Sequence, residues 1–319
     1  MVSGSAGGGE SADRRRGFCR GADPEGNEKR GGPAGPPFFV SRGSHRYGGC
    51  PVWSGPRGSG TDAGMIDPTS STPAEVLAAA RAIVASRYPD AAFALVAGSL
   101  MRGEGTAHSD LDLIVLYDRI ESSRRESFVT GGVPVEAFVH DDETLAWAID
   151  VAATRGRPSL LAMIAEATAI GRAPHRAGRL REVVAGLLAK GPPPMAPAQL
   201  DALRYAITDA VQDLRGARDE AERVGIGVLL YPLLAELALR GRGRWNATGK
   251  WVPRALAGID DGLARRFDHA FRALFASNAA DAVVTLAERE LAPHGGMRFD
   301  GDVQVAHRSW RASPARFGA

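Results

Sequence analysis

Two aspartates alternate with leucines in the most apolar strand-like run of the chain, "SDLDLIVLYD" at 109–118. Because successive side chains of a strand point to opposite faces, Asp110 and Asp112 share one face while Leu111 and Leu113 pack behind them. Neighbouring carboxylates repel each other, and a bound cation relieves that repulsion. Mg²⁺ prefers hard oxygen ligands. The pair therefore predicts a site for one or two Mg²⁺ ions, and a solvent-facing amphipathic strand is the alternative interpretation.

A glycine and a serine follow an earlier apolar run, "AAFALVAG" at 91–98. Gly98 lets another group approach the backbone closely, and backbone N–H groups together with the Ser99 hydroxyl can hold a terminal phosphate. An ordinary tight turn is the alternative. The chain has no GxxxxGK[ST] pattern, so this loop is not a Walker A motif.

These two features form a single pattern. Ala97-Gly98-Ser99 is followed by ten residues and then by Asp110-Leu111-Asp112-Leu113. The stretch resembles the signature of the nucleotidyltransferase superfamily typified by DNA polymerase beta. The resemblance implies an α/β (α+β) nucleotidyltransferase domain with a small mixed sheet, followed by an all-α helical bundle. It also implies that Gly98 and Ser99 bind a nucleotide and that the two acids hold Mg²⁺.

A third acid stands in the middle of another apolar run, "VPVEAFVHDD". Burying Glu136 without a partner would be costly, and a metal ion or a reactive hydroxyl is such a partner. The segment looks like that of the aminoglycoside nucleotidyltransferases, and this resemblance implies that Glu136 is the general base. A role for Glu136 as a third metal ligand is the other possibility within the same resemblance. An edge-strand residue is the plain alternative.

Two basic side chains complete the candidate site. Segment 240–256 places Lys250 directly before Trp251 and after Trp245. The resemblance implies that Lys250 contacts the triphosphate while one of the tryptophans lines the pocket. Arg102, in the loop before the acids, is placed to neutralise phosphate charge. Core tryptophans beside a surface lysine, and an exposed loop arginine, are the alternatives.

The chain divides into four parts by composition. Residues 1–64 hold 17 of the 39 glycines and show no periodicity, which predicts a disordered extension upstream of an expected native start at Met65. An arginine-glycine tail that contacts RNA is the alternative for that extension. We expect the nucleotidyltransferase domain at 65–190, a breaker "KGPPPMAP" at 190–197, a helical bundle that binds substrate at 195–292 and a tail at 293–319.

Periodicity and cap residues predict the elements of the two ordered parts. In the first part we expect a helix from Thr72-Pro73 to about Arg87, strands within 91–98, 109–118 and 132–141, a helix capped by Asp141 or Asp142, and a helix ending in a short strand over 158–171. In the second we expect helices near 197–222, 224–241, 250–258, 260–276 and 278–291.

The expected activity follows from the resemblance. We expect an enzyme that uses Mg²⁺ and transfers a nucleoside monophosphate to a hydroxyl of a small molecule, with release of pyrophosphate. The expected donor is ATP, which supplies AMP, or another nucleoside triphosphate. An antitoxin-type protein adenylyltransferase and a nucleotide-binding regulator without turnover are the alternatives. Residues 195–292 carry thirteen acids and thirteen bases, so no strongly acidic pocket for a polycationic aminoglycoside is evident.

Charge and hydropathy limit the partners that the sequence predicts. The formal net charge is +2, and no basic stripe interleaved with aromatic residues is visible, so we expect no nucleic-acid partner. No apolar run is long enough for a membrane span, and we expect a cytoplasmic protein. The two cysteines, Cys19 and Cys50, show no spacing typical of a zinc site. The sequence does not predict the oligomeric state.

Overall fold

The computed structural model describes residues 66–303 and 305. The predicted extension 1–64, the expected start at Met65 and most of the predicted tail lie outside the described residues. The first part contains α1 (Pro73–Arg87), β1 (Phe93–Ala97), β2 (Leu111–Leu116), β3 (Arg124–Thr130), β4 (Val133–His140), α2 (Asp142–Thr154), α3 (Ser159–Glu166), β5 (Thr168–Gly171), η2 (Pro174–Arg176) and α4 (Ala177–Lys190). The second contains α5 (Pro197–Gly216), α6 (Glu220–Arg240), α7 (Trp251–Ala257), α8 (Asp261–Ser277), α9 (Asp281–Leu291) and η3 (Ala292–His294).

Side-chain caps begin the first two helices where the sequence predicts them. The Thr72 hydroxyl accepts a hydrogen bond from the backbone of Glu75, whose carboxylate accepts one from the Thr72 backbone. Asp141 caps α2 in the same reciprocal way with Thr144. Such caps satisfy backbone N–H groups that the helix itself leaves without partners.

The five strands form one mixed sheet in the order β3-β4-β2-β1-β5. β2 and β4 run parallel, and the other neighbouring pairs are antiparallel. β4 therefore lies between β2 and the edge strand β3, to which it is joined through Gly131 and Gly132, both with positive φ. The mixed sheet followed by helices confirms the predicted fold class.

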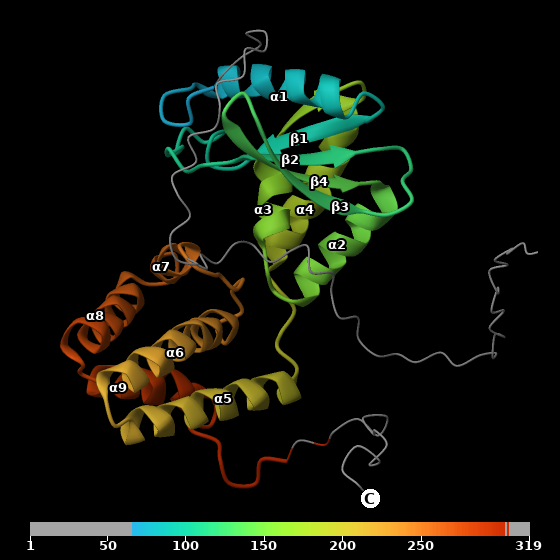
Figure 1. Cartoon of the computed structure of the whole chain (residues 1–319). Coiled ribbons are helices and arrows are strands. Elements are labelled where there is room, and N and C mark those ends of the chain that lie inside the picture. The colour runs from blue at the N-terminus through green and yellow to red at the C-terminus, as the bar shows by residue number, and fades with distance from the viewer. Residues whose placement is uncertain (1–65, 304, 306–319) are drawn as a thin grey trace, which may run out of the picture. The chain divides into compact units, whose positions relative to one another are not determined.

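Helices cover both faces of the sheet (Figure 1). α1 packs on the face to which Leu111, Leu113 and Val115 point. Helices α2, α3 and α4 pack on the opposite face, against side chains that include Ile114 and Leu116. Asp112 alternates with Leu111 and Leu113, so its carboxylate lies on the face that α2, α3 and α4 cover.

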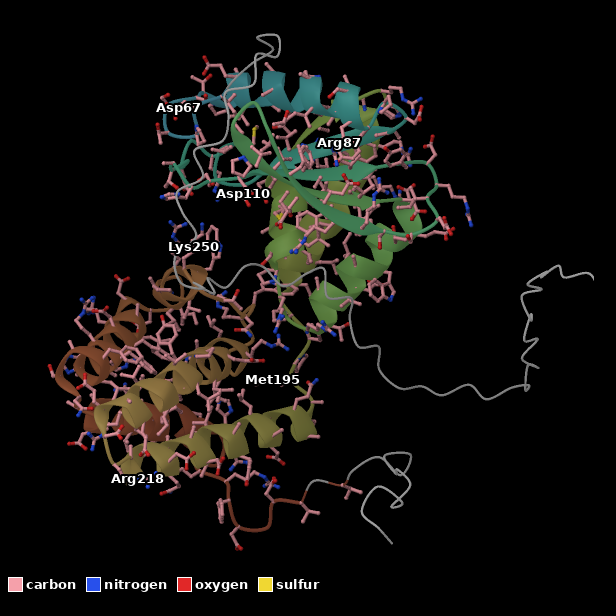
Figure 2. All side chains as sticks on the ribbon, viewed as in Figure 1. Asp67, Arg87, Asp110, Met195, Arg218 and Lys250 are labelled. Atoms are coloured by element: carbon pink, nitrogen blue, oxygen red, sulfur yellow. The ribbon has the colours of Figure 1, made fainter. Side chains whose placement is uncertain are left out.

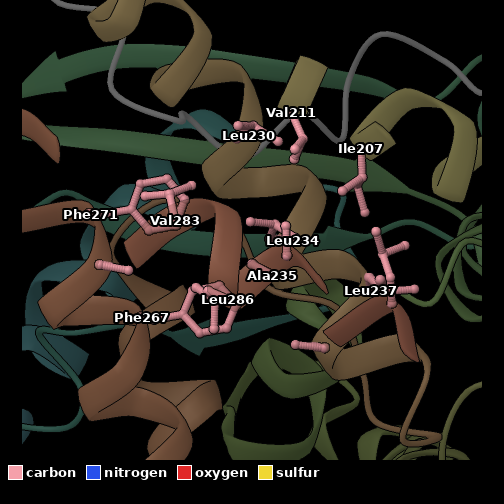
Figure 3. Close-up of a cluster of buried hydrophobic side chains, with 14 of the residues drawn as sticks. Ile207, Val211, Leu230, Leu234, Ala235, Leu237, Phe267, Phe271, Val283 and Leu286 are labelled. Atoms are coloured by element: carbon pink, nitrogen blue, oxygen red, sulfur yellow. The ribbon is translucent and has the colours of Figure 1, made fainter. Parts of the chain in front are cut away.

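The helical region has a separate buried cluster of its own (Figure 3). The cluster contains residues from α5 to α9, and its labelled members include Leu230, Leu234, Phe267 and Phe271. Between α4 and α5, the breaker segment forms no helix or strand over 191–196. Prolines there remove backbone donors and restrict the residue that precedes each of them.

One strand and one α-helix were not predicted from the sequence. Strand β3 is mostly exposed on both faces and lacks the alternation of a half-buried strand. Helix α4 follows η2, and no side chain caps its first turn, so its start lacks a local sequence signal. Within the described part of the chain, no helix has the length and apolar character that crossing a membrane requires.

Candidate metal and nucleotide site

Asp112 and Glu136 are direct neighbours across the parallel pair β2 and β4. Asp110 stands two residues before Asp112, just ahead of the first residue of β2 (Figure 2). One carboxylate oxygen of each of these three acids lies within 4.8 Å of one from each of the others. All three are half-buried. The structure therefore brings the three predicted acids together at one end of the central strands.

Gly98 provides the space for this group of acids. It follows β1 with φ +89°, a conformation that glycine adopts far more readily than other residues. A Cβ at this position would overlap the Asp112 carboxylate. The sequence predicted a close approach to the backbone here, and the group that approaches is a side chain of the site itself.

Burial and nearby negative charge raise the pKa of Asp112 in the metal-free protein. Burial, followed by repulsion from Asp110 and Glu136, raises the pKa of Asp112 to about 7. Arg102 opposes this shift. A cation among the three carboxylates would relieve the same repulsion, and three such oxygens are ligands that Mg²⁺ accepts.

Glu136 has a basic partner that the sequence did not indicate. Arg125 Nη1 lies 3.5 Å from Glu136 Oε1, and the Arg125 side chain is 32% exposed while that of Glu136 is 19% exposed. Arg125 belongs to β3, where Ser127 is the register partner of Glu136. Arg125 and Ser127 are two residues apart, so they share the face on which Glu136 lies.

The loop between Gly98 and Asp110 is held by its own polar side chains. Ser99 Oγ donates a hydrogen bond to Ser109 Oγ at 3.1 Å. Ser109 Oγ in turn accepts one from the Thr106 amide at 2.9 Å. The Ser99 hydroxyl is thus engaged within the loop, and it lies in the turn directly after β1 as predicted.

A fourth carboxylate reaches this loop from α3. The Gly98 amide donates to Glu166 Oε1 at 3.4 Å, and Arg102 Nη1 donates to the same oxygen at 2.6 Å. Arg102 Nε also bonds Glu104 at 3.1 Å. Glu166 is the last residue of α3, and nothing in its sequence neighbourhood signals this contact.

The predicted basic residues meet at the ring of Trp251. Lys250, the residue before α7, is exposed (Figure 2). Its Nζ lies 6.0 Å from the centroid of the Trp251 ring. The guanidinium carbons of Arg102 and Arg254 lie 5.6 Å and 4.8 Å from the same centroid. Such cation–aromatic contacts are favourable when the cation lies over the ring face. Arg254 was not predicted, although its spacing of three residues from Trp251 on one helix was a usable signal.

The other tryptophan of this segment has a structural role. Trp245 Nε1 donates to the carbonyl of Leu188 in α4 at 3.1 Å, and the ring packs against the core beneath the sheet. Trp251 is 42% exposed. Of the two rings, Trp251 is therefore the one available to a ligand.

Comparisons with known proteins add little to this geometry. No protein-family model matches the sequence, and no curated protein matches it either. The structure is similar to the crystal structure of a nucleotidyltransferase-like protein from Exiguobacterium sibiricum 255-15. The TM-score is 0.38 and the identity 14%, over 67% of this chain and 73% of that one.

Proposed function

We propose that the protein is a Mg²⁺-dependent nucleotidyltransferase that transfers a nucleoside monophosphate, AMP from ATP in the first instance, to a hydroxyl group. The observation that carries this proposal is the convergence of Asp110, Asp112 and Glu136 at the end of two parallel strands, beside the Gly98 turn. Three carboxylates held within 4.8 Å of one another at a glycine turn are a ligand set that suits a metal-bound triphosphate, because Mg²⁺ prefers hard oxygen ligands.

Each residue has a distinct part in this reaction. Asp110 and Asp112 would hold Mg²⁺, which when bound would supply charge neutralisation of the phosphates and polarisation of the α-phosphorus. The loop after Gly98, with Arg102 and Lys250, binds the triphosphate. Glu136 accepts the proton of the acceptor hydroxyl, whose oxygen bonds to the α-phosphorus as the bond to the bridging oxygen breaks and pyrophosphate leaves.

The acceptor in this proposal is a small molecule with a free hydroxyl. The balance of thirteen acids and thirteen bases in residues 195–292 favours a neutral or weakly charged compound over a polycation. A hydroxyl on a protein partner, and a regulator that binds nucleotide without turnover, are outcomes that the following experiment separates from it.

The test is pyrophosphate release from ATP, GTP, CTP and UTP with Mg²⁺, against aminoglycosides, lincosamides, sugars and nucleotides as acceptors. Asp112→Asn serves as the inactive variant. Asp118→Asn, an exposed acid beyond the other end of β2, is the matched control and should behave like the wild type. Release that needs one acceptor and Asp112 supports the proposal and names the acceptor. Absence of release with every acceptor, despite Mg²⁺-dependent ATP binding, would contradict transfer to a small molecule.

A further inference from the structure

The Glu166 carboxylate accepts hydrogen bonds where a triphosphate oxygen would be expected to accept them. A single oxygen, Glu166 Oε1, accepts hydrogen bonds from both the Gly98 amide and the Arg102 guanidinium. A backbone N–H at a glycine turn together with an arginine is a typical donor set for phosphate, and a carboxylate oxygen carries similar charge. These two donors also belong to the triphosphate-binding loop of the proposed function.

The position of Glu166 allows this contact to be broken at low cost. Glu166 ends α3, the next residue is already extended, and its side chain is 32% exposed. Its partner Arg102 is 29% exposed and is also paired with Glu104, so it stays partly neutralised if Glu166 leaves. Partly exposed ion pairs contribute little to stability. The side chain can therefore turn into solvent without unfolding α3.

Charge gives a reason for Glu166 to move when a nucleotide arrives. Asp110, Asp112 and Glu136 lie close together, with Asp112 against the Gly98 turn, and Glu166 adds a further carboxylate at that turn. A triphosphate in this place would be repelled by Glu166 more directly than by the three acids that a metal ion can bridge.

We propose that Glu166 is a displaceable substitute for phosphate, which occupies the Gly98 and Arg102 donors in the empty enzyme and must leave before the triphosphate binds. This inference rests on the proposed function. Glu166 thereby sets the affinity for the nucleotide, since every binding event must first break its two hydrogen bonds. Removal of its charge should strengthen binding, which is the opposite of what removal of a direct nucleotide ligand would do.

The test is calorimetric titration of the full chain with α,β-methylene-ATP and Mg²⁺, which avoids turnover. Glu166→Gln keeps the size of the side chain, and Glu166→Ala removes it. Both should bind about fivefold to tenfold more tightly than the wild type, the difference expected when a charge-assisted hydrogen bond no longer competes. Inorganic tripolyphosphate with Mg²⁺ should show the same ratio, because the base takes no part in this competition.

Glu104→Gln is the matched control. It removes an equal charge from Arg102 but leaves Gly98 untouched, and its effect should be below about twofold because the pair is exposed. Equal tightening in Glu104→Gln would overturn the inference, since the effect would then be general electrostatics. Unchanged or weaker binding in the Glu166 variants, with normal binding in the wild type, would overturn it while leaving the proposed function intact. Failure of every variant and of the wild type to bind would overturn both.

Discussion

Gly98 and Asp112 are in such close contact that a methyl group on the first would overlap the carboxylate of the second. Gly98 also has a positive φ, so its lack of a side chain serves two needs at once. The turn after β1 and the acid on β2 are therefore one structural unit.

Replacing Gly98 by alanine should reduce both stability and metal binding. Strain at a positive φ costs about 1–3 kcal/mol, and the new methyl group must push Asp112 away from the other two acids. Gly103→Ala is the matched control, because Gly103 also has a positive φ but has open space around it. Gly103→Ala should carry a similar strain cost, so it should lower the melting temperature, but it should leave the Mg²⁺ affinity unchanged. Equal Mg²⁺ affinities for the two variants would refute the role of Gly98 in placing Asp112.

Asp112→Asn should abolish turnover while making the metal-free protein more stable at pH 8. The substitution removes a crowded carboxylate from a half-buried place and keeps its shape. We expect a fall in Mg²⁺-dependent turnover of about 100-fold or more, as for loss of a main electrostatic group of an active site. Pyrophosphate release measures the loss of turnover, and thermal unfolding in EDTA measures the gain in stability. A destabilised metal-free variant at pH 8 would show that the acids are not in mutual repulsion.

The response to Mg²⁺ should depend on pH in a defined direction. Because the pKa of Asp112 is raised to about 7, the folded protein holds this proton more tightly than the unfolded chain does. The metal-free protein should therefore lose stability through this group as the pH rises from about 4 to about 7. Mg²⁺ must displace the same proton, so its affinity should fall by about tenfold for each unit below about pH 7.

Melting temperatures with and without Mg²⁺ between pH 5 and pH 8.5 measure this dependence, with Asp112→Asn as the control. The gain from Mg²⁺ should grow toward high pH in the wild type. A gain that is independent of pH would mean that Asp112 takes no part in metal binding.

Glu136→Gln distinguishes the two roles that this acid can have. A glutamine cannot accept the acceptor proton, so turnover should fall by about 100-fold or more while Mg²⁺-dependent binding of α,β-methylene-ATP persists. Calorimetry and pyrophosphate release on the same preparation separate the two. Equal loss of binding and turnover would make Glu136 a metal ligand in place of the general base.

Most of the fold could be predicted because its signals are local. The Thr72-Pro73 start of α1, the apolar runs of β1, β2 and β4, and the proline-rich breaker before α5 each lie within a few residues. The spacing of Gly98, Asp110 and Asp112 likewise predicted a group of acids beside a glycine turn. Glu136 was predicted as a site residue because it is an acid in the middle of an apolar strand.

The missed parts depend on contacts between distant segments. β3 is an edge strand with charged residues on both faces, so it has no alternation that a sequence could reveal. Arg125 was missed with it. Glu166 reaches Gly98 across 68 residues because α3 packs beneath β1, and no local pattern encodes that packing.

The order β3-β4-β2 also determines when the carboxylates meet during folding. β3 and β4 form a hairpin around Gly131 and Gly132, and such hairpins form in about 1–10 μs without help from the rest of the chain. Asp112 and Glu136 become neighbours only when that hairpin docks along β2 in parallel, a slower non-local step. The three carboxylates would then be able to bind Mg²⁺ only late in folding. We expect the ion to lengthen the lifetime of the native state by slowing unfolding, and to leave the rate of folding almost unchanged.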